Sequence, residues 1–179
     1  MATTKHALVA MVTDKPGVLN RIASLFRRRG FNIESIAVGH SEVPQISRMT
    51  IVVDGSTTQV EQVRKQLEKV VDVIKVSDVT GEGTITRELA MIKVKATSTN
   101  RSEIMQIVDI FRANIVDVSS DSVAVEVTGD EEKVHSLYKL LRNFGIIEIA
   151  RTGVIAMTRG GESSSMMEAR QPKSRTKKN

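Results

Sequence analysis

One short turn in the sequence has residue types and spacing that suit the binding of a small molecule. Residues 13–17, Thr-Asp-Lys-Pro-Gly, follow an apolar run and precede apolar residues at helical spacing, so the turn leads into a helix start. The first N–H groups of a helix have no partner within it and carry a partial positive charge, which suits a carboxylate. Pro16 lacks an N–H, so the donors are Gly17, Val18 and Leu19. Gly17 also lets a ligand approach the backbone closely.

An amino acid would find further partners in the residues that follow. Asn32 lies at the start of the next predicted strand, and its amide can donate to a carboxylate and accept from an ammonium group. The apolar residues that could receive an aliphatic side chain are Leu19, Ile33 and Ile36. The alternative is that Asp14 is simply the N-cap of the helix and Pro16 its first-turn proline. The spacing favours neither interpretation.

No other stretch has a recognisable catalytic or metal-binding motif. The three histidines, His6, His40 and His135, lack ligand spacing, and metalloprotease, phosphate-loop and nucleophile-elbow patterns are absent. The segment 81–83, Gly-Glu-Gly, begins like a dinucleotide-binding pattern, but position 86 is threonine, so a linker is the better interpretation. We therefore predict no catalytic residue, no metal site and no cofactor on this chain.

Composition excludes several classes of protein. The chain has no cysteine and no apolar run long enough for a membrane span, and its first residues do not read as a secretory signal, so we expect a cytoplasmic protein that does not bind membranes. The net charge is +5, and residues 160–179 contribute most of it. That basic segment is rich in Gly and Ser, and we predict that it is disordered.

The helix start belongs to a pattern of elements that occurs twice, in the order βαββαβ. The strands expected in the first copy are 6–12, 32–40, 48–53 and about 71–77. Those in the second are 88–96, 114–119 and 122–128, and residues 146–157 form a final strand or strand pair. The pattern predicts an α+β chain of two ferredoxin-like domains in tandem, each with two helices on one face of an antiparallel sheet. The predicted boundaries are 5–79, a linker at 80–87, 88–159, and the tail 160–179.

Strand 6–12 is apolar on both of its faces, although helices cover only one face of such a sheet. A second copy of the chain could cover the other face, so we expect a homodimer. The alternative is that the two domains of one chain cover each other.

The order βαββαβ is also that of a common RNA-binding module, which stacks bases on aromatic residues of its central strands. Strands 6–12 and 48–53 contain no aromatic residue. The basic run Arg27-Arg28-Arg29 is better explained as a solvated or subunit-contact face than as a phosphate site. We therefore predict no nucleic-acid partner.

The turn and its setting resemble the ACT domain, a ferredoxin-like ligand-sensing module. Four segments are similar to the small subunits of acetolactate synthase: 30–53 (GFNIESIAVGHSEVPQISRMTIVV), 87–95 (RELAMIKVK), 111–119 (FRANIVDVS) and 151–160 (RTGVIAMTRG). The resemblance covers residues 5–160, with the motifs in the family's order.

The resemblance implies a non-catalytic regulatory subunit in the biosynthesis of branched-chain amino acids. Its partner would be a large subunit that carries thiamine diphosphate, magnesium and FAD and forms acetolactate from pyruvate. The small subunit raises that activity and confers feedback inhibition, typically by valine bound between two ACT domains. The residues implied for valine are Asp14, Pro16, Gly17, Val18, Leu19, Asn32 and Ile33, with Gly17 and Val18 holding the carboxylate and the partner's Asn32 completing the site.

The loop 41–48 is the expected contact with the catalytic subunit, through Pro44, Gln45, Ser47 and Arg48. One position departs from the family pattern, since Asp14 stands where asparagine is frequent. An aspartate repels a ligand carboxylate but can pair with an ammonium group. The alternatives are an ACT-domain sensor of another amino acid that acts on a different enzyme, and a nucleic-acid-binding protein that uses the basic tail.

Overall fold

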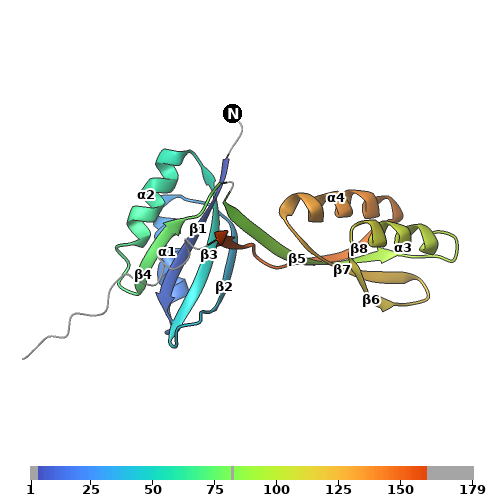
Figure 1. Ribbon diagram of the computed structural model, residues 1–179, viewed down its shortest axis with the longest axis horizontal. Helices are drawn as coiled ribbons and strands as arrows, with labels where there is room; N and C mark the ends of the chain where they lie inside the picture. The colour runs from blue at the N-terminus through green and yellow to red at the C-terminus, as the bar shows by residue number, and fades with distance from the viewer. Residues whose placement is uncertain (1–3, 82, 161–179) are drawn as a thin grey trace, which may run out of the picture. The chain divides into compact units, whose positions relative to one another are not determined.

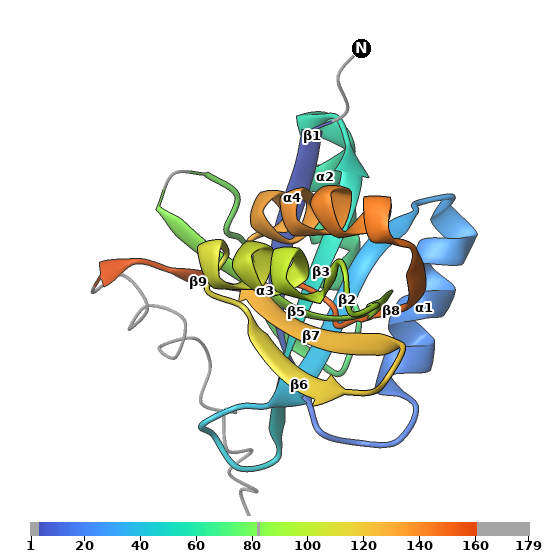
Figure 2. The ribbon, with the colours of Figure 1, turned by 90° about the vertical axis from the view of Figure 1, so that its right-hand side faces the viewer.

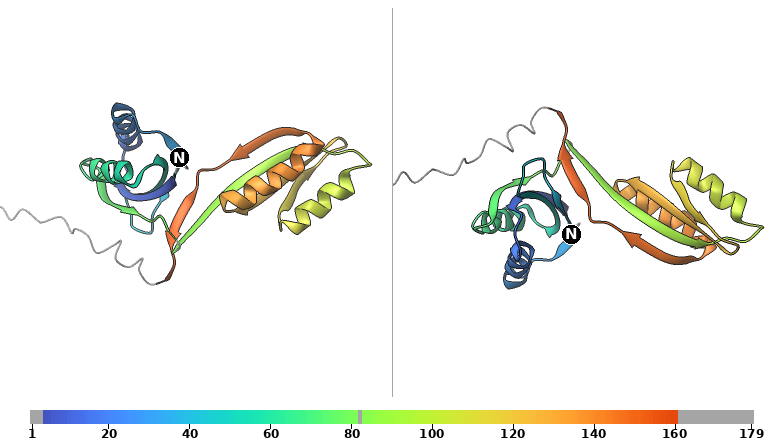
Figure 3. Two further views of the ribbon diagram at one scale, coloured as in Figure 1. Left: turned by 90° about the horizontal axis from the view of Figure 1, so that it is seen from above. Right: turned by 90° about the horizontal axis from the view of Figure 1, so that it is seen from below.

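The computed structural model describes residues 4–81 and 83–160, which form two units. The first unit contains the described residues up to Ile85 together with those from Ala156 onward, and the second unit is Thr86–Ile155. The predicted disordered tail lies outside the described residues except for Gly160. In each unit, both helices lie against one face of the unit's own sheet (Figures 1 and 3).

The first unit has the predicted order βαββαβ and an antiparallel sheet with strand order β2-β3-β1-β4. Its elements are β1 (Thr4–Thr13), α1 (Val18–Arg29), β2 (Ile33–His40), β3 (Ile46–Gly55), α2 (Thr57–Leu67) and β4 (Val73–Asp78). Apolar residues of α1 and α2 pack on the inward-facing residues of β1 and β3 to form its core. Since β3 is antiparallel to both β1 and β2, these two strands run in the same direction.

Two glycines mark the start and the end of helix α1. Gly17 precedes it with φ 85°, and Gly30 ends it with φ 68°, both in the left-handed region that glycine adopts at least cost. The Gly30 N–H closes the helix by donating to the carbonyls of Arg27 and Phe26. Between the glycines, Val18, Ile22, Leu25 and Phe26 are buried on one side of the helix.

The second unit repeats the same sheet order, as β6-β7-β5-β8. Its elements are β5 (Thr84–Lys95), α3 (Arg101–Ile110), β6 (Asn114–Val118), β7 (Ser122–Gly129), α4 (Glu131–Leu141), the 3-10 helix η1 (Arg142–Phe144) and β8 (Ile146–Arg151). Figure 2 shows α3 and α4 side by side over the sheet. The predicted fold class, two ferredoxin-like units in an α+β chain, is confirmed.

The structure divides the chain differently from the predicted boundaries. Strand β5 begins at Thr84, inside the predicted linker 80–87. The last strand, β9 (Ile155–Thr158), pairs with β5, and from Ala156 onward its residues belong to the first unit rather than to a domain 88–159. The reason is packing, because Ala156 is buried against Val9 and Val79.

This packing also bears on the expected homodimer, which was inferred because strand 6–12 is apolar on both faces. Val9, on the face of β1 opposite the helices, is only 1% exposed, because residues of its own chain cover it. An uncovered apolar face of β1 is therefore no longer a reason to expect a second copy.

Within the two described ranges, no helix is long and apolar enough to cross a membrane.

Candidate functional site

The turn between β1 and α1 leaves the start of the helix without a side-chain cap. The N-cap residue is Gly17, which has no side chain to accept a bond from the first turn. Asp14 is not the cap: its Oδ2 lies 3.3 Å from His40 Nδ1, and its N–H donates to the Gln45 carbonyl. Of the two interpretations left open by the sequence, the capping role of Asp14 is wrong.

Backbone donors are therefore free at this helix start. Among the described residues, the N–H groups of Gly17 and Leu19 have no hydrogen-bond partner, and that of Val18 makes only a long bond of 3.4 Å to the Lys15 carbonyl. The first turn of α1 also lacks an acidic residue. Helix α2, in contrast, is closed by a capping box of Ser56 and Gln59. The start of α1 is thus suited to an anionic group such as a carboxylate.

The side chains around the turn have different exposure. Pro16 and Gly17 are exposed, and Leu19 is 50% exposed, so these residues can contact a ligand. The side chain of Val18 is buried in the core, which leaves only its backbone to take part.

Asn32 and Ile33 lie at the other end of the sheet within one chain. Ile33 pairs with Val53, which also pairs with His6 near the start of β1, whereas the turn follows the end of β1. Helix α1, with 12 residues, separates Gly17 from Asn32 and rises by about 18 Å. The expectation that Asn32 and Ile33 lie near the turn is therefore wrong for residues of the same chain.

These distant residues also have partners of their own. The Asn32 amide donates to Glu34 Oε1 over 2.7 Å. Ile33 and Ile36 are partly buried and pack against the core of the first unit.

An anchor beneath the turn was not predicted. Asp72 is 9% exposed, and its carbonyl accepts from the Thr13 N–H over 2.9 Å. Its carboxylate accepts from Thr13 Oγ1 over 3.2 Å and from Arg21 Nη1 over 2.5 Å. The signal in the sequence is a single acidic residue inside the apolar run 70–74 (Val-Val-Asp-Val-Ile), where an ionised group needs a partner.

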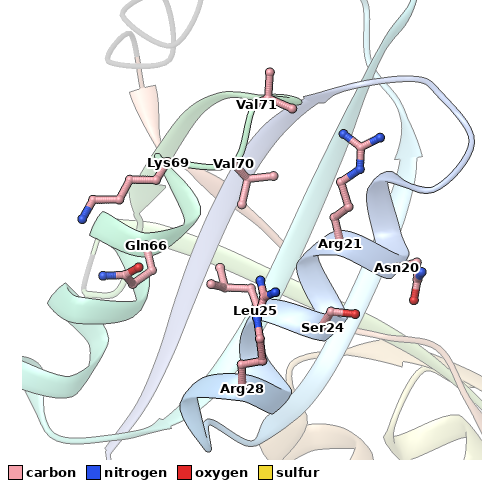
Figure 4. Close-up of a pocket in the computed structure, with 9 residues that line it drawn as sticks. All are labelled: Asn20, Arg21, Ser24, Leu25, Arg28, Gln66, Lys69, Val70 and Val71. Carbon is pink, nitrogen blue, oxygen red and sulfur yellow. The ribbon is translucent and has the colours of Figure 1, made fainter.

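A separate groove of about 630 Å³ lies between α1 and α2. Figure 4 shows its residues, which are Asn20, Arg21, Ser24, Leu25, Arg28, Gln66, Lys69, Val70 and Val71. Arg21 is already engaged by Asp72, and the groove does not include Gly17 or Leu19. In the parts of the chain that the structure covers, no group of three His, Asp or Glu side chains could hold a metal ion.

Comparison with known proteins identifies the family of this chain. A family model described as an AHAS small subunit-like ACT domain matches residues 8–75, and one described as the small subunit of acetolactate synthase matches residues 87–160. The probable acetolactate synthase small subunit of Methanothermobacter thermautotrophicus is 56% identical over 164 residues, which cover 91% of this chain and 98% of that protein. The chain belongs to the acetolactate synthase small-subunit family.

Two further relatives agree with the resemblance noted in the sequence. The acetolactate synthase small subunit of Mycobacterium bovis is 49% identical over 160 residues, covering 89% of this chain and 95% of that protein. The crystal structure of the small subunit from Thermotoga maritima is 44% identical, with a TM-score of 0.82, and the match covers 88% of this chain and 99% of that chain. Membership in this family implies a large, catalytic subunit as the partner.

The residues expected to touch that catalytic subunit divide into two pairs. Pro44 and Gln45 are exposed at the tip of the hairpin between β2 and β3. Ser47 is only 6% exposed, so it cannot contribute much to such a surface. Arg48 is partly buried and donates from Nη2 to the Ala156 carbonyl over 2.8 Å. The hairpin tip is therefore the better candidate for a contact than the start of β3.

Proposed function

We propose that this small subunit activates the large, thiamine-diphosphate-dependent subunit of an acetolactate synthase and mediates its feedback inhibition by valine. The observation that carries the proposal is the uncapped start of α1, where the Gly17 and Leu19 N–H groups lack partners. They can hold the carboxylate of an amino acid, and the half-exposed Leu19 can contact its aliphatic side chain.

A dimer formed through strand β2 accounts for the role of Asn32. β2 is an edge strand with an exposed Val38, and an open edge can pair with a second chain. In a two-fold pairing of β2 with its copy, the strands are antiparallel, and the start of one strand lies beside the end of the other. That end is His40, next to Asp14. The partner's Asn32 and the partner's Ile33 would then approach the turn.

The catalytic chemistry belongs to the large subunit in this proposal. Thiamine diphosphate, magnesium and FAD are assigned to that subunit, and the assembly is assigned to the cytoplasm. The small subunit acts by shifting a conformational equilibrium, which requires that valine bind one arrangement of the dimer more tightly than another. A coupling free energy of about 1–3 kcal/mol is typical of such regulation.

Reconstitution tests the proposal directly. The chain is mixed with the large subunit of the same organism, and acetolactate is measured with and without valine, leucine and isoleucine. We expect higher activity on addition of the small subunit and inhibition by valine. Stimulation without inhibition by any of the three amino acids would reject the sensor role, and no stimulation would reject the subunit role.

Asn32→Ala tests the dimeric site. We expect more valine to be needed for inhibition while activation is unchanged, because the amide contacts the effector and not the large subunit. Asn143→Ala, which removes an exposed asparagine in the second unit, is the matched control. If activation and inhibition disappear together in a folded Asn32→Ala protein, the site is wrongly assigned.

A further inference from the structure

Two sets of contacts, which differ in strength, hold the turn that precedes α1. On one side, the nearly buried Asp72 binds Thr13 through its carbonyl and carboxylate and also binds Arg21. On the other side, Asp14 contacts the β2–β3 hairpin twice. Its N–H donates to the Gln45 carbonyl over 2.8 Å, and its carboxylate lies 3.3 Å from His40 Nδ1.

Hydrogen bonds within the β2–β3 hairpin restrict changes in its internal conformation. The Ser41 N–H donates to the Ile46 carbonyl over 2.9 Å, and Ser41 Oγ donates to the same carbonyl and accepts from the Val43 N–H. Gln45 has φ 62°, a left-handed conformation that a residue with a side chain rarely adopts. A shift of the Gln45 carbonyl therefore moves the hairpin tip as one body.

The two sides differ in how much they resist movement. Breaking the contacts of Asp72 leaves a carboxylate in a nearly buried position, which is costly. The His40 and Asp14 side chains are 86% and 47% exposed, so water readily replaces their contact. A ligand that displaces the turn therefore changes the contacts between the turn and the hairpin and leaves those with Asp72 in place.

We propose that the β2–β3 hairpin transmits occupancy of the helix start to the catalytic subunit, with Asp14 as the coupling residue and His40 as a positioning residue. The inference rests on the proposed function, since it concerns how effector binding at the same site changes the partner. Because coupling between two binding events is reciprocal, contact of the hairpin with the large subunit also changes the affinity of the turn for its effector.

The test measures coupling separately from binding. Calorimetry gives the valine Kd of the free small subunit and of the complex with saturating large subunit, and the ratio of the two values is the coupling factor. In His40→Ala we expect this ratio to move toward one by about two- to fivefold, the range expected for one exposed side-chain contact. The valine Kd of the free subunit should change by less than about twofold. His135→Ala, at an exposed histidine of α4, is the matched control and should leave both quantities unchanged.

A double-mutant cycle assigns the effect to the pair. Asp14→Asn removes the charge but keeps the N–H that donates to Gln45, and the double variant with His40→Ala should show no further loss of coupling than Asp14→Asn alone. Additive losses would overturn the pairing. If valine regulates the wild type but His40→Ala leaves the coupling factor unchanged, transmission through the hairpin is wrong and the proposed function still stands. Absence of valine binding and inhibition in the wild type would instead reject the proposed function.

Discussion

Arg21 Nη1 lies 2.5 Å from Oδ2 of Asp72, and this contact joins the first turns of α1 to the segment that precedes β4. The arginine side chain is 55% exposed, whereas that of Asp72 is 12% exposed. The same carboxylate accepts a hydrogen bond from Thr13 at the end of β1. Asp72 therefore holds both ends of the β1–α1 turn in place.

Asp72→Asn should destabilise the first unit by about 1–3 kcal/mol, because the variant weakens two charge-assisted contacts at a nearly buried position. The free energy of unfolding from urea titration measures the effect. Arg21→Ala should cost at least as much, because it leaves the nearly buried Asp72 carboxylate without its cationic partner, whereas in Asp72→Asn the half-exposed guanidinium is solvated. Equal stability of Asp72→Asn and the wild type would show that the anchor contributes nothing.

Gly17→Ala should lower stability by about 1 kcal/mol, because φ at this position is 85° and a side chain disfavours that conformation. An added Cβ meets no atom within 4 Å, so the cost comes from the backbone alone. The concentration of valine needed for inhibition should also rise, since relaxation of the turn moves the free N–H groups. Gly83→Ala is the control, because this glycine has no positive φ and equally open surroundings. Thermal unfolding and inhibition assays give the two quantities.

Glu61 makes the stability of the chain depend on acidic pH. A hydrogen bond from Arg64 is the main cause that lowers the pKa of Glu61 from 4.5 to about 2, despite opposing desolvation. Because the folded pKa lies below the unfolded one, the pair stabilises the fold above pH 4.5 and loses this effect as pH falls toward about 2. The difference in Tm between wild type and Glu61→Gln should therefore shrink over that range. Glu148→Gln, at an exposed glutamate, should show a smaller pH dependence.

Ala156→Asp should destabilise the first unit by about 2–4 kcal/mol, because it buries a carboxylate against Val9 and Val79. The next residue of β9 is the matched control: Met157 is 59% exposed, and Met157→Asp should change stability by less than about 0.5 kcal/mol. Urea unfolding followed by circular dichroism measures both. Similar losses in the two variants would contradict the assignment of Ala156 to the first unit.

Much of the fold could be predicted from local patterns in the sequence. Apolar spacing indicated α1, and Gly30 marked its end, because a glycine in the left-handed region satisfies the last carbonyls of a helix. The turn at 13–17 was identified because proline and glycine between an apolar run and residues at helical spacing are typical of a chain that turns into a helix. These features depend on residues that are close in sequence.

The remaining features depend on how distant segments meet. The sequence indicated a final strand or strand pair at 146–157 but not which unit the buried Ala156 would contact. It placed Asn32 at a strand start, yet the separation from Gly17 follows only from the parallel direction of β1 and β2. The burial of Ser47 and the role of Asp72 likewise arise from tertiary packing.

The return of Ala156 to the first unit has a consequence for synthesis on the ribosome. Domains usually fold as they emerge, the N-terminal one first. Here the packing around Val9 includes a residue near the end of the described chain. During synthesis, β1 of the first unit therefore stays incompletely covered on one apolar face until the segment that contains Ala156 has been made.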